Sequence, residues 1–159
     1  MLKYILLLVL FTFTLYAKTI QFSEEKYFES LEMTFYKKGK ITFLKDKIEV
    51  IYENDNTVLT YSNNLLIKQK GLDKIEVDLR TKPAIKMFFV LFEAIYFDKK
   101  KILQAYFTAK TDKGVTTLRP NKNIAAYIHS VHYKKQNKYL EFLKIHMRNN
   151  DRILIEETY

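Results

Sequence analysis

The residue types that most often carry chemistry are scarce in this chain of 159 residues. There is no cysteine, which excludes disulfides, thiol nucleophiles and thiolate metal sites. The only histidines are His129, His132 and His146. On a strand, a spacing of three places His129 and His132 on opposite faces, so we do not expect them to share a metal ion. The sequence therefore predicts no metal site and no cofactor.

Two pairs of adjacent carboxylates, Glu24-Glu25 and Glu156-Glu157, stand near the termini. We interpret both pairs as solvated charge and not as paired catalytic acids. The sequence contains no Gly-x-Ser-x-Gly, His-Glu-x-x-His or glycine-rich phosphate-binding motif. We therefore expect a protein that is not an enzyme, and a hydrolase acting on envelope material is the weakest of the alternatives.

The formal net charge of +9 by itself allows nucleic acid or an anionic membrane surface as partner. The N-terminal residues decide between them. Lys3 precedes an uncharged, mostly apolar run over 4–16, and the small residue Ala17 ends it, which is the layout of a secretory signal peptide. A retained membrane anchor is the alternative, but the run is short for a span. We expect cleavage near Ala17, one exported domain over 18–159, and no nucleic-acid partner.

Two lysine-rich segments, 37–40 and 99–101, are predicted to be solvated turns. A second interpretation is that they contact anionic lipid head groups, where each basic residue near the surface contributes about 1 kcal/mol.

Most of the chain from Leu31 onward alternates apolar and polar residues in short runs between polar turns. In the clearest run, Ile75, Val77 and Leu79 share one face of a strand. This period of two indicates an antiparallel sheet or barrel. The segments 18–28 and 102–107 leave helix and strand open. The expected strands are 31–35, 41–43, 48–52, 57–61, 65–68, 75–80, 105–109, 115–119, 126–133, 139–147 and 153–157.

One long apolar stretch, 83–97, interrupts these strands and is predicted to be a helix. Pro83 suits its first position, because proline has no N–H to leave unpaired there. Only Lys86 and Glu93 are charged, so a helix here is apolar nearly all round and must be covered nearly all round. It is too short to span a bilayer, which takes about 20 residues. It is either a core helix or the lid of an apolar cavity.

The strand expected at 139–147 supports the second interpretation, because it carries apolar residues on both faces. Leu143, Ile145 and Met147 lie on one face, and Leu140 and Phe142 lie on the other. Such a strand needs cover on both sides, from helices or from a ligand. An ordinary two-sided core is the alternative. The residues expected to line a lipid site are Met87, Phe88, Phe89, Leu91, Phe92, Tyr96, Val50, Tyr52, Leu143, Ile145 and Met147.

The pattern of strands and turns, strongest in the C-terminal half, resembles a known family. The segments that carry it are Leu118-Arg119-Pro120, 128–133, 139–147, the polar turn Asn149-Asn150-Asp151 and Ile153-Leu154-Ile155, with a looser likeness at 49–54 and 57–61. Together with the signal-like N-terminus and the apolar helix, they are similar to the periplasmic outer-membrane lipoprotein carriers (LolA-like).

This resemblance implies a mainly β, α+β fold, a half-open antiparallel β-barrel with a helical lid or plug at 84–97. It implies a periplasmic monomer that holds the acyl chains of a lipoprotein, or of another lipid, on the way to the outer membrane. An inner-membrane exporter and an outer-membrane acceptor are implied as partners. The competing class is a periplasmic protein-binding or structural module whose apolar helix is only core.

Two departures from the family pattern bear on the mechanism. The family has a longer N-terminal helix, for which there is little room between Lys18 and Leu31. It also carries an arginine beside an aromatic residue on an early strand, where it helps to hold the lid. The corresponding segment here, 48–52, has no arginine. We therefore expect a diverged paralogue.

Overall fold

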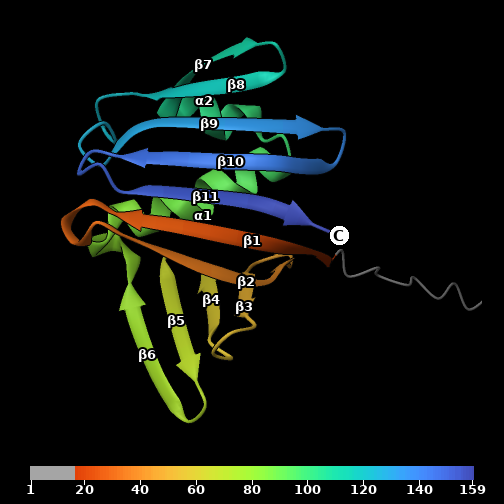
Figure 1. The fold of residues 1–159 in the computed structure, drawn as a ribbon, viewed down its shortest axis with the longest axis vertical. Coiled ribbons are helices and arrows are strands. Elements are labelled where there is room, and N and C mark those ends of the chain that lie inside the picture. Colours follow the sequence, from red (N-terminus) through yellow and green to blue (C-terminus); the bar gives the residue numbers. More distant parts are fainter. Residues whose placement is uncertain (1–16) are drawn as a thin grey trace, which may run out of the picture.

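A computed structural model describes residues 17–159 as one antiparallel sheet of eleven strands with two α-helices (Figure 1). The signal peptide expected over the first 17 residues lies, except for Ala17, outside the described residues. The strands follow the order β6-β5-β4-β3-β2-β1-β11-β10-β9-β8-β7. The chain thus forms two meanders, joined where β1 lies beside β11. The prediction of a mainly β, antiparallel fold with few helices is confirmed.

The elements alternate short turns with strands of very different length. In chain order they are β1 Lys18–Phe28, a 3₁₀ turn Glu29–Leu31, β2 Met33–Phe43, β3 Ile48–Tyr52, β4 Val58–Ser62, β5 Leu65–Lys70, β6 Asp73–Asp78, a 3₁₀ turn Leu79–Thr81, α1 Pro83–Tyr96, α2 Lys100–Tyr106, β7 Phe107–Asp112, β8 Val115–Pro120, β9 Ile128–Gln136, β10 Tyr139–Met147 and β11 Arg152–Thr158.

The sheet bends strongly but does not close, so β6 and β7 remain as its two edges. In Figure 1 the strands β1, β11, β10 and β9 run across the view, whereas β5 and β6 stand nearly upright. Both helices lie behind the sheet. We name the face toward α1 the inner face and the opposite face the outer face. Among residues 17–159, no helix has the length and apolar character needed to cross a membrane.

The long strands β1 and β2 form the centre of the sheet, and they correct one prediction. Their register is regular from Lys18 opposite Phe43 to Phe28 opposite Met33. The lysine-rich segment 37–40, expected to be a turn, is therefore part of β2. Gly39 favoured the turn prediction, but it is needed for packing. A Cβ atom on Gly39 would overlap the Ile51 carbonyl oxygen, so β3 approaches β2 closely at this point.

The tight turns follow the expected polar segments. Asn63 and Asn64 both have positive φ between the paired residues Ser62 and Leu65, as a two-residue hairpin turn with a right-handed strand twist requires. Lys113 and Gly114 do the same between β7 and β8. These turns confirm the predicted hairpins.

The predicted helix is α1, with Pro83 at its first position. The chain leaves it through Asp98, which has a φ of 54°, and begins α2 two residues later. The lysine-rich segment 99–101 is thus partly helical and not a turn. The strand expected from residue 105 begins at Phe107, because Ala105 and Tyr106 belong to α2.

The close approach at Gly39 gives a test of the sheet. We expect Gly39→Ala to lower the free energy of unfolding by about 1–3 kcal/mol, because the new methyl group overlaps backbone that cannot move alone. The control is Lys40→Ala, at an exposed position of the same strand. Urea unfolding followed by circular dichroism measures both. Equal midpoints for the two variants would contradict the packing described here.

Candidate functional site

Aromatic stacking attaches α1 to the inner face of the sheet. The ring of Phe43 on β2 stacks on Phe92 at 5.7 Å and on Tyr96 at 4.8 Å between ring centroids. Tyr61 on β4 stacks on Phe89 at 4.8 Å. Because these contacts come from β2 and β4, the helix covers the inner face near the start of β1 and leaves the far end of β1 and β2 without cover.

The structure brings the predicted lipid-site residues together as one core. Nine of them are buried, namely Met87, Phe89, Leu91, Phe92, Tyr96, Val50, Tyr52, Leu143 and Ile145, and all belong to one hydrophobic cluster. Phe88 and Met147 are partly buried and pack against it. These side chains fill the space between helix and sheet, so most of them are occupied with one another and not with an open surface.

Exposed apolar side chains gather instead where β1 joins β2. The register places Phe28, Met33 and Phe35 on the inner face, in line with the buried Ile41. Met33 is 52% exposed and Phe35 is 42% exposed. Across the sheet, Ile153 lies opposite Lys26 and is only partly buried. We name this region, made up of Phe28, Met33, Phe35, Met147 and Ile153, the open end.

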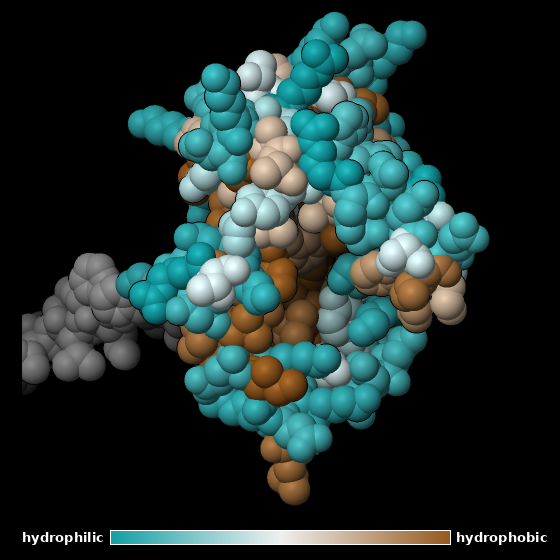
Figure 2. Space-filling model, turned by 90° about the vertical axis from the view of Figure 1, so that its left-hand side faces the viewer, coloured by the Kyte–Doolittle hydropathy of each residue, from teal (hydrophilic) through white to brown (hydrophobic). Residues whose placement is uncertain are grey.

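The open end is on the side of the molecule shown in Figure 2. That view shows a hollow lined mainly by hydrophobic residues, with a hydrophilic rim around it. The predicted lipid-site set contains only one open-end residue, Met147. The signal for the others was present, because Met33 and Phe35 alternate with polar residues, but only the curvature of the sheet shows that nothing covers them.

A charged cluster lies on the inner face between the core and the open end. Glu24 is only 3% exposed, although its pair with Glu25 was expected to be solvated. Its carboxylate accepts a hydrogen bond from the Tyr52 hydroxyl, at 3.3 Å, and lies 3.2 Å from the Lys26 ammonium. The expectation failed because 18–28 is a strand, whose alternation places Glu24 in line with the buried Phe22.

Two further contacts complete this cluster, which we name the Glu24 cluster and which consists of Glu24, Lys26, Lys37 and Tyr52. Lys37 lies opposite Glu24 in the sheet, and its ammonium stands 4.4 Å from the centroid of the Tyr52 ring. Burial, and then the nearby Glu24 carboxylate, raises the pKa of Tyr52 far above its ordinary value. The hydroxyl therefore stays protonated and remains a donor to Glu24.

The C-terminus of α1 is held by a lysine that sequence reasoning missed. Lys135 on β9 donates hydrogen bonds to the carbonyl oxygens of Ile95 at 3.3 Å and Tyr96 at 2.6 Å, and its ammonium lies 2.7 Å from the Asp98 carboxylate. A cation suits the last carbonyls of a helix, which have no partner within the helix. Lys135 thus joins the helix to the sheet. No arginine on β3 contributes to this attachment, because β3 contains none.

A register shift corrects the prediction for 139–147. The pairing of β10 with β9 is irregular between Leu140 and Phe142. Leu140 is therefore buried in the same cluster as Leu143, although strict alternation would put the two on opposite faces. The strand needs less cover on its outer face than its sequence indicated.

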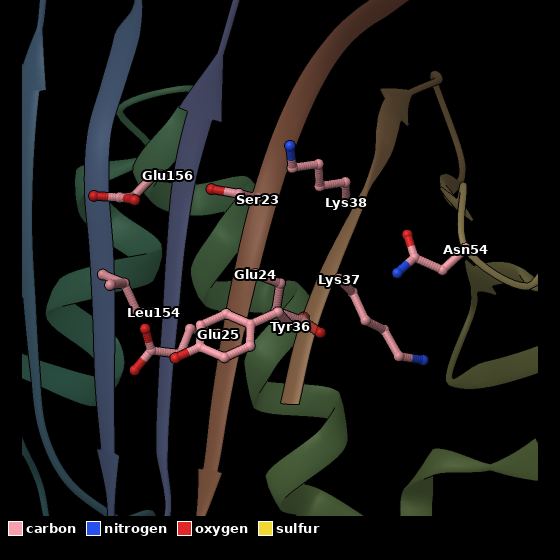
Figure 3. A pocket seen from close by; sticks show the side chains of 9 residues that line it. All are labelled: Ser23, Glu24, Glu25, Tyr36, Lys37, Lys38, Asn54, Leu154 and Glu156. Carbon is pink, nitrogen blue, oxygen red and sulfur yellow. The ribbon is translucent and has the colours of Figure 1, made fainter. Parts of the chain in front are cut away.

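One depression on the outer face is lined mostly by charged and polar residue types. Figure 3 shows this depression of about 260 Å³, where the side chains of Ser23, Lys38 and Glu156 lie in front of the strands and helical ribbon lies behind them. Three glutamates, two lysines and a single leucine are among the residues that line it, and the glutamates and lysines include Glu24 and Lys37 of the inner face.

The histidines also lie toward this outer face. The rings of His132 and His146 meet edge to face at 5.7 Å, and burial lowers the pKa of both. His129 and His132 line one depression, contrary to the prediction of opposite faces, because the pairing of β9 with β10 shifts between His146 and Met147. Within residues 17–159, no group of three or more potential ligands is placed to hold a metal ion.

Comparison of the sequence with protein-family models and with curated proteins finds no significant match.

The contact between Lys135 and α1 can be tested by mutation. We expect Lys135→Met to lower the free energy of unfolding by about 1–3 kcal/mol, because the last carbonyls of α1 lose a charged donor. Hydrogen exchange should also speed up at the end of α1. Urea unfolding and exchange mass spectrometry measure the two effects.

The matched control is Lys134→Met. The neighbouring Lys134 forms a partly exposed ion pair with Glu141, and such pairs contribute about 1 kcal/mol at most. If both variants lose the same stability and α1 exchanges at its original rate, Lys135 does not anchor the helix.

Proposed function

We propose that this protein is a non-enzymatic periplasmic carrier that binds the acyl chains of lipoproteins, or of another lipid, and moves them toward the outer membrane. The observation that carries the proposal is the open end, where Met33 and Phe35 of the inner face are exposed, on the side of the molecule that shows a hydrophobic hollow (Figure 2). Exposed apolar surface of this kind is typical of binding sites, because water contact there is unfavourable until a ligand covers it.

The physical demands on such a carrier agree with this arrangement. Each buried acyl methylene contributes about 0.8 kcal/mol, so a free acylated molecule in water inserts into the nearest membrane or aggregates. A carrier must offer apolar surface and must also give the chain up again. An edge of the core that is only partly covered offers that surface without requiring the core to open.

The proposal includes a LolA-like fold in which α1 acts as a lid or plug. The first turn of α1 supports it, since Ile85 is exposed and Phe88 is only partly buried, whereas most side chains of the later turns are buried. A small tilt of this turn would change the apolar surface that a chain contacts. Loading from an inner-membrane exporter and release to an outer-membrane acceptor would bias that position by differential binding.

One observation favours a second candidate, a periplasmic module that binds protein. The buried side chains of α1, such as Phe89 and Phe92, act as core in this structure. If α1 is only core, the open end is free to take an apolar side chain of a partner protein in place of an acyl chain.

The two candidates differ in what the purified protein carries. We expect residues 18–159, purified from a bacterial periplasm without detergent, to contain close to one equivalent of acyl lipid. Mass spectrometry of organic extracts measures it and identifies the lipid class. Protein that is free of lipid and does not take up a fluorescent apolar probe would favour the protein-binding module.

A second test places a charge in the open end. We expect Phe35→Glu to weaken the binding of an apolar probe by at least about tenfold, because the loss of two methylene contacts, at about 0.8 kcal/mol each, has that effect. The substitution should leave the fold intact, since Phe35 is 42% exposed. Fluorescence titration measures the affinity.

The control is Tyr36→Glu, one residue further along β2. Tyr36 is 69% exposed and lines the depression on the outer face. We expect this variant to bind the probe as the unchanged protein does. If Phe35→Glu also binds normally, the acyl chain does not occupy the open end.

A further inference from the structure

The Glu24 cluster has no role in holding an apolar chain. The desolvation penalty of burying a carboxylate usually exceeds the attraction of a simple ion pair. Apolar residues of the same size usually stabilise a core at least as well. Yet Glu24 is buried beside Phe22 and Ile155, on the face that would carry the lipid. Buried charges with specific partners beside a hollow are typical of functional sites.

The group of this cluster that reaches the open end is the ammonium of Lys26. Glu24 is enclosed, and its oxygens already bind Tyr52 and Lys26. The Lys26 side chain is 32% exposed, and its residue lies opposite Phe35 in the sheet. An ammonium has three donors, and within the part of the chain that the structure describes Glu24 is its only polar partner. Two donors thus remain for a ligand.

Lys37 adds a second cation at the same place. Lys37 is the next residue after Phe35 on the inner face of β2. It is therefore a diagonal neighbour of Lys26, and the Cα atoms of Lys26 and Lys37 are roughly 7–8 Å apart. Each lysine has one acidic neighbour, Glu24 beside Lys26 and Asp55 near Lys37, where the lysine helps to lower the pKa of the Asp55 carboxyl. An anion between the two ammonium groups would accept hydrogen bonds from the donors that these neighbours leave available.

We propose that Lys26 and Lys37 bind the negatively charged head group of the carried acyl lipid, while its chain lies along the open end. This inference rests on the proposed carrier function and narrows its cargo to a lipid with a carboxylate or phosphodiester head. A lipid whose head is blocked as an amide or ester offers only carbonyl oxygens, which accept weaker hydrogen bonds from an ammonium than a charged oxygen does. Glu24 and Tyr52 are positioning residues, because they hold the Lys26 ammonium at the edge of the hollow.

The test compares lipids with the same chain and different heads. Residues 18–159 are loaded with the neutral fluorescent probe N-phenyl-1-naphthylamine, which is then displaced by oleate, oleyl alcohol or phosphatidylglycerol. We expect oleate and phosphatidylglycerol to displace the probe at concentrations about tenfold or more below that of oleyl alcohol, which is the usual strength of a hydrogen bond to a charged group. Millimolar inorganic phosphate, which has no chain, should displace none.

Two variants assign the preference to the cluster. The double variant Glu24→Gln with Lys26→Met removes both charges together, so that no buried charge is left unpaired and the net charge is unchanged. We expect it to bind oleate about tenfold more weakly and oleyl alcohol within about twofold of the unchanged protein. Lys26→Arg should keep the preference. Lys38→Met is the control, because Lys38 follows Lys37 in the strand and its side chain lies on the opposite, outer face, opposite Ser23 in the register (Figure 3).

The outcomes separate this inference from the carrier function. If oleate and oleyl alcohol bind equally well, or if the double variant keeps the preference for oleate, the head-group site is wrong and the carrier proposal stands. If none of the lipids displaces the probe, or the probe does not bind, the carrier proposal itself is wrong. If inorganic phosphate by itself displaces the probe, the cluster binds anions without an acyl chain, and the head-group inference is wrong.

Discussion

The stacking of Phe43 against Phe92 and Tyr96 determines how much of the sheet α1 can cover. A sheet with one apolar face must bury that face, and eleven curved strands present more of it than a helix of fourteen residues can reach. Because the stack holds α1 over the start of β1 and the end of β2, the opposite end of the same strands is left to solvent. The hollow is thus a consequence of where the helix is attached.

The attachment of α1 combines two kinds of interaction. Aromatic rings hold the side of the helix, and Lys135 holds its C-terminal carbonyls. The first turn, which begins at Pro83, has neither and is the more exposed end of the helix. The helix is therefore fixed at one end and less constrained at the other, and the less constrained end is the one with Ile85 and Phe88.

Local patterns predicted most of the elements, because the signals that decide them are local. Pro83 and the apolar run after it gave α1, and Asn63-Asn64 gave a hairpin. The failures came where tertiary contacts decide. Gly39 suggested a turn but is required by the approach of β3, and Leu140 returns to the core only through a register shift. Glu24 is buried because 18–28 is a strand, and the local pattern of that segment leaves helix and strand open.

The sequence predicts which residues make up the apolar site better than it predicts which of them are exposed. The chosen aromatic and aliphatic residues do come together, but mostly as filled core, because a period of two or of 3.6 identifies an apolar face without showing how much of it a neighbour covers. Met33 and Phe35 have the same pattern as Ile41 and Phe43 on the same strand. Only the position of the helix distinguishes the exposed pair from the buried pair.

The two free edges of the sheet have a consequence for solubility. Strands at an edge present unpaired backbone groups that can recruit another chain, and a closed barrel avoids this by having no edge. Here β6 carries Lys74 and Glu76 as an ion pair at 2.6 Å, and β7 carries Lys110 and Asp112. An added strand would have to place its own side chains against these charges. The charged edge residues therefore oppose growth of the sheet by a further strand.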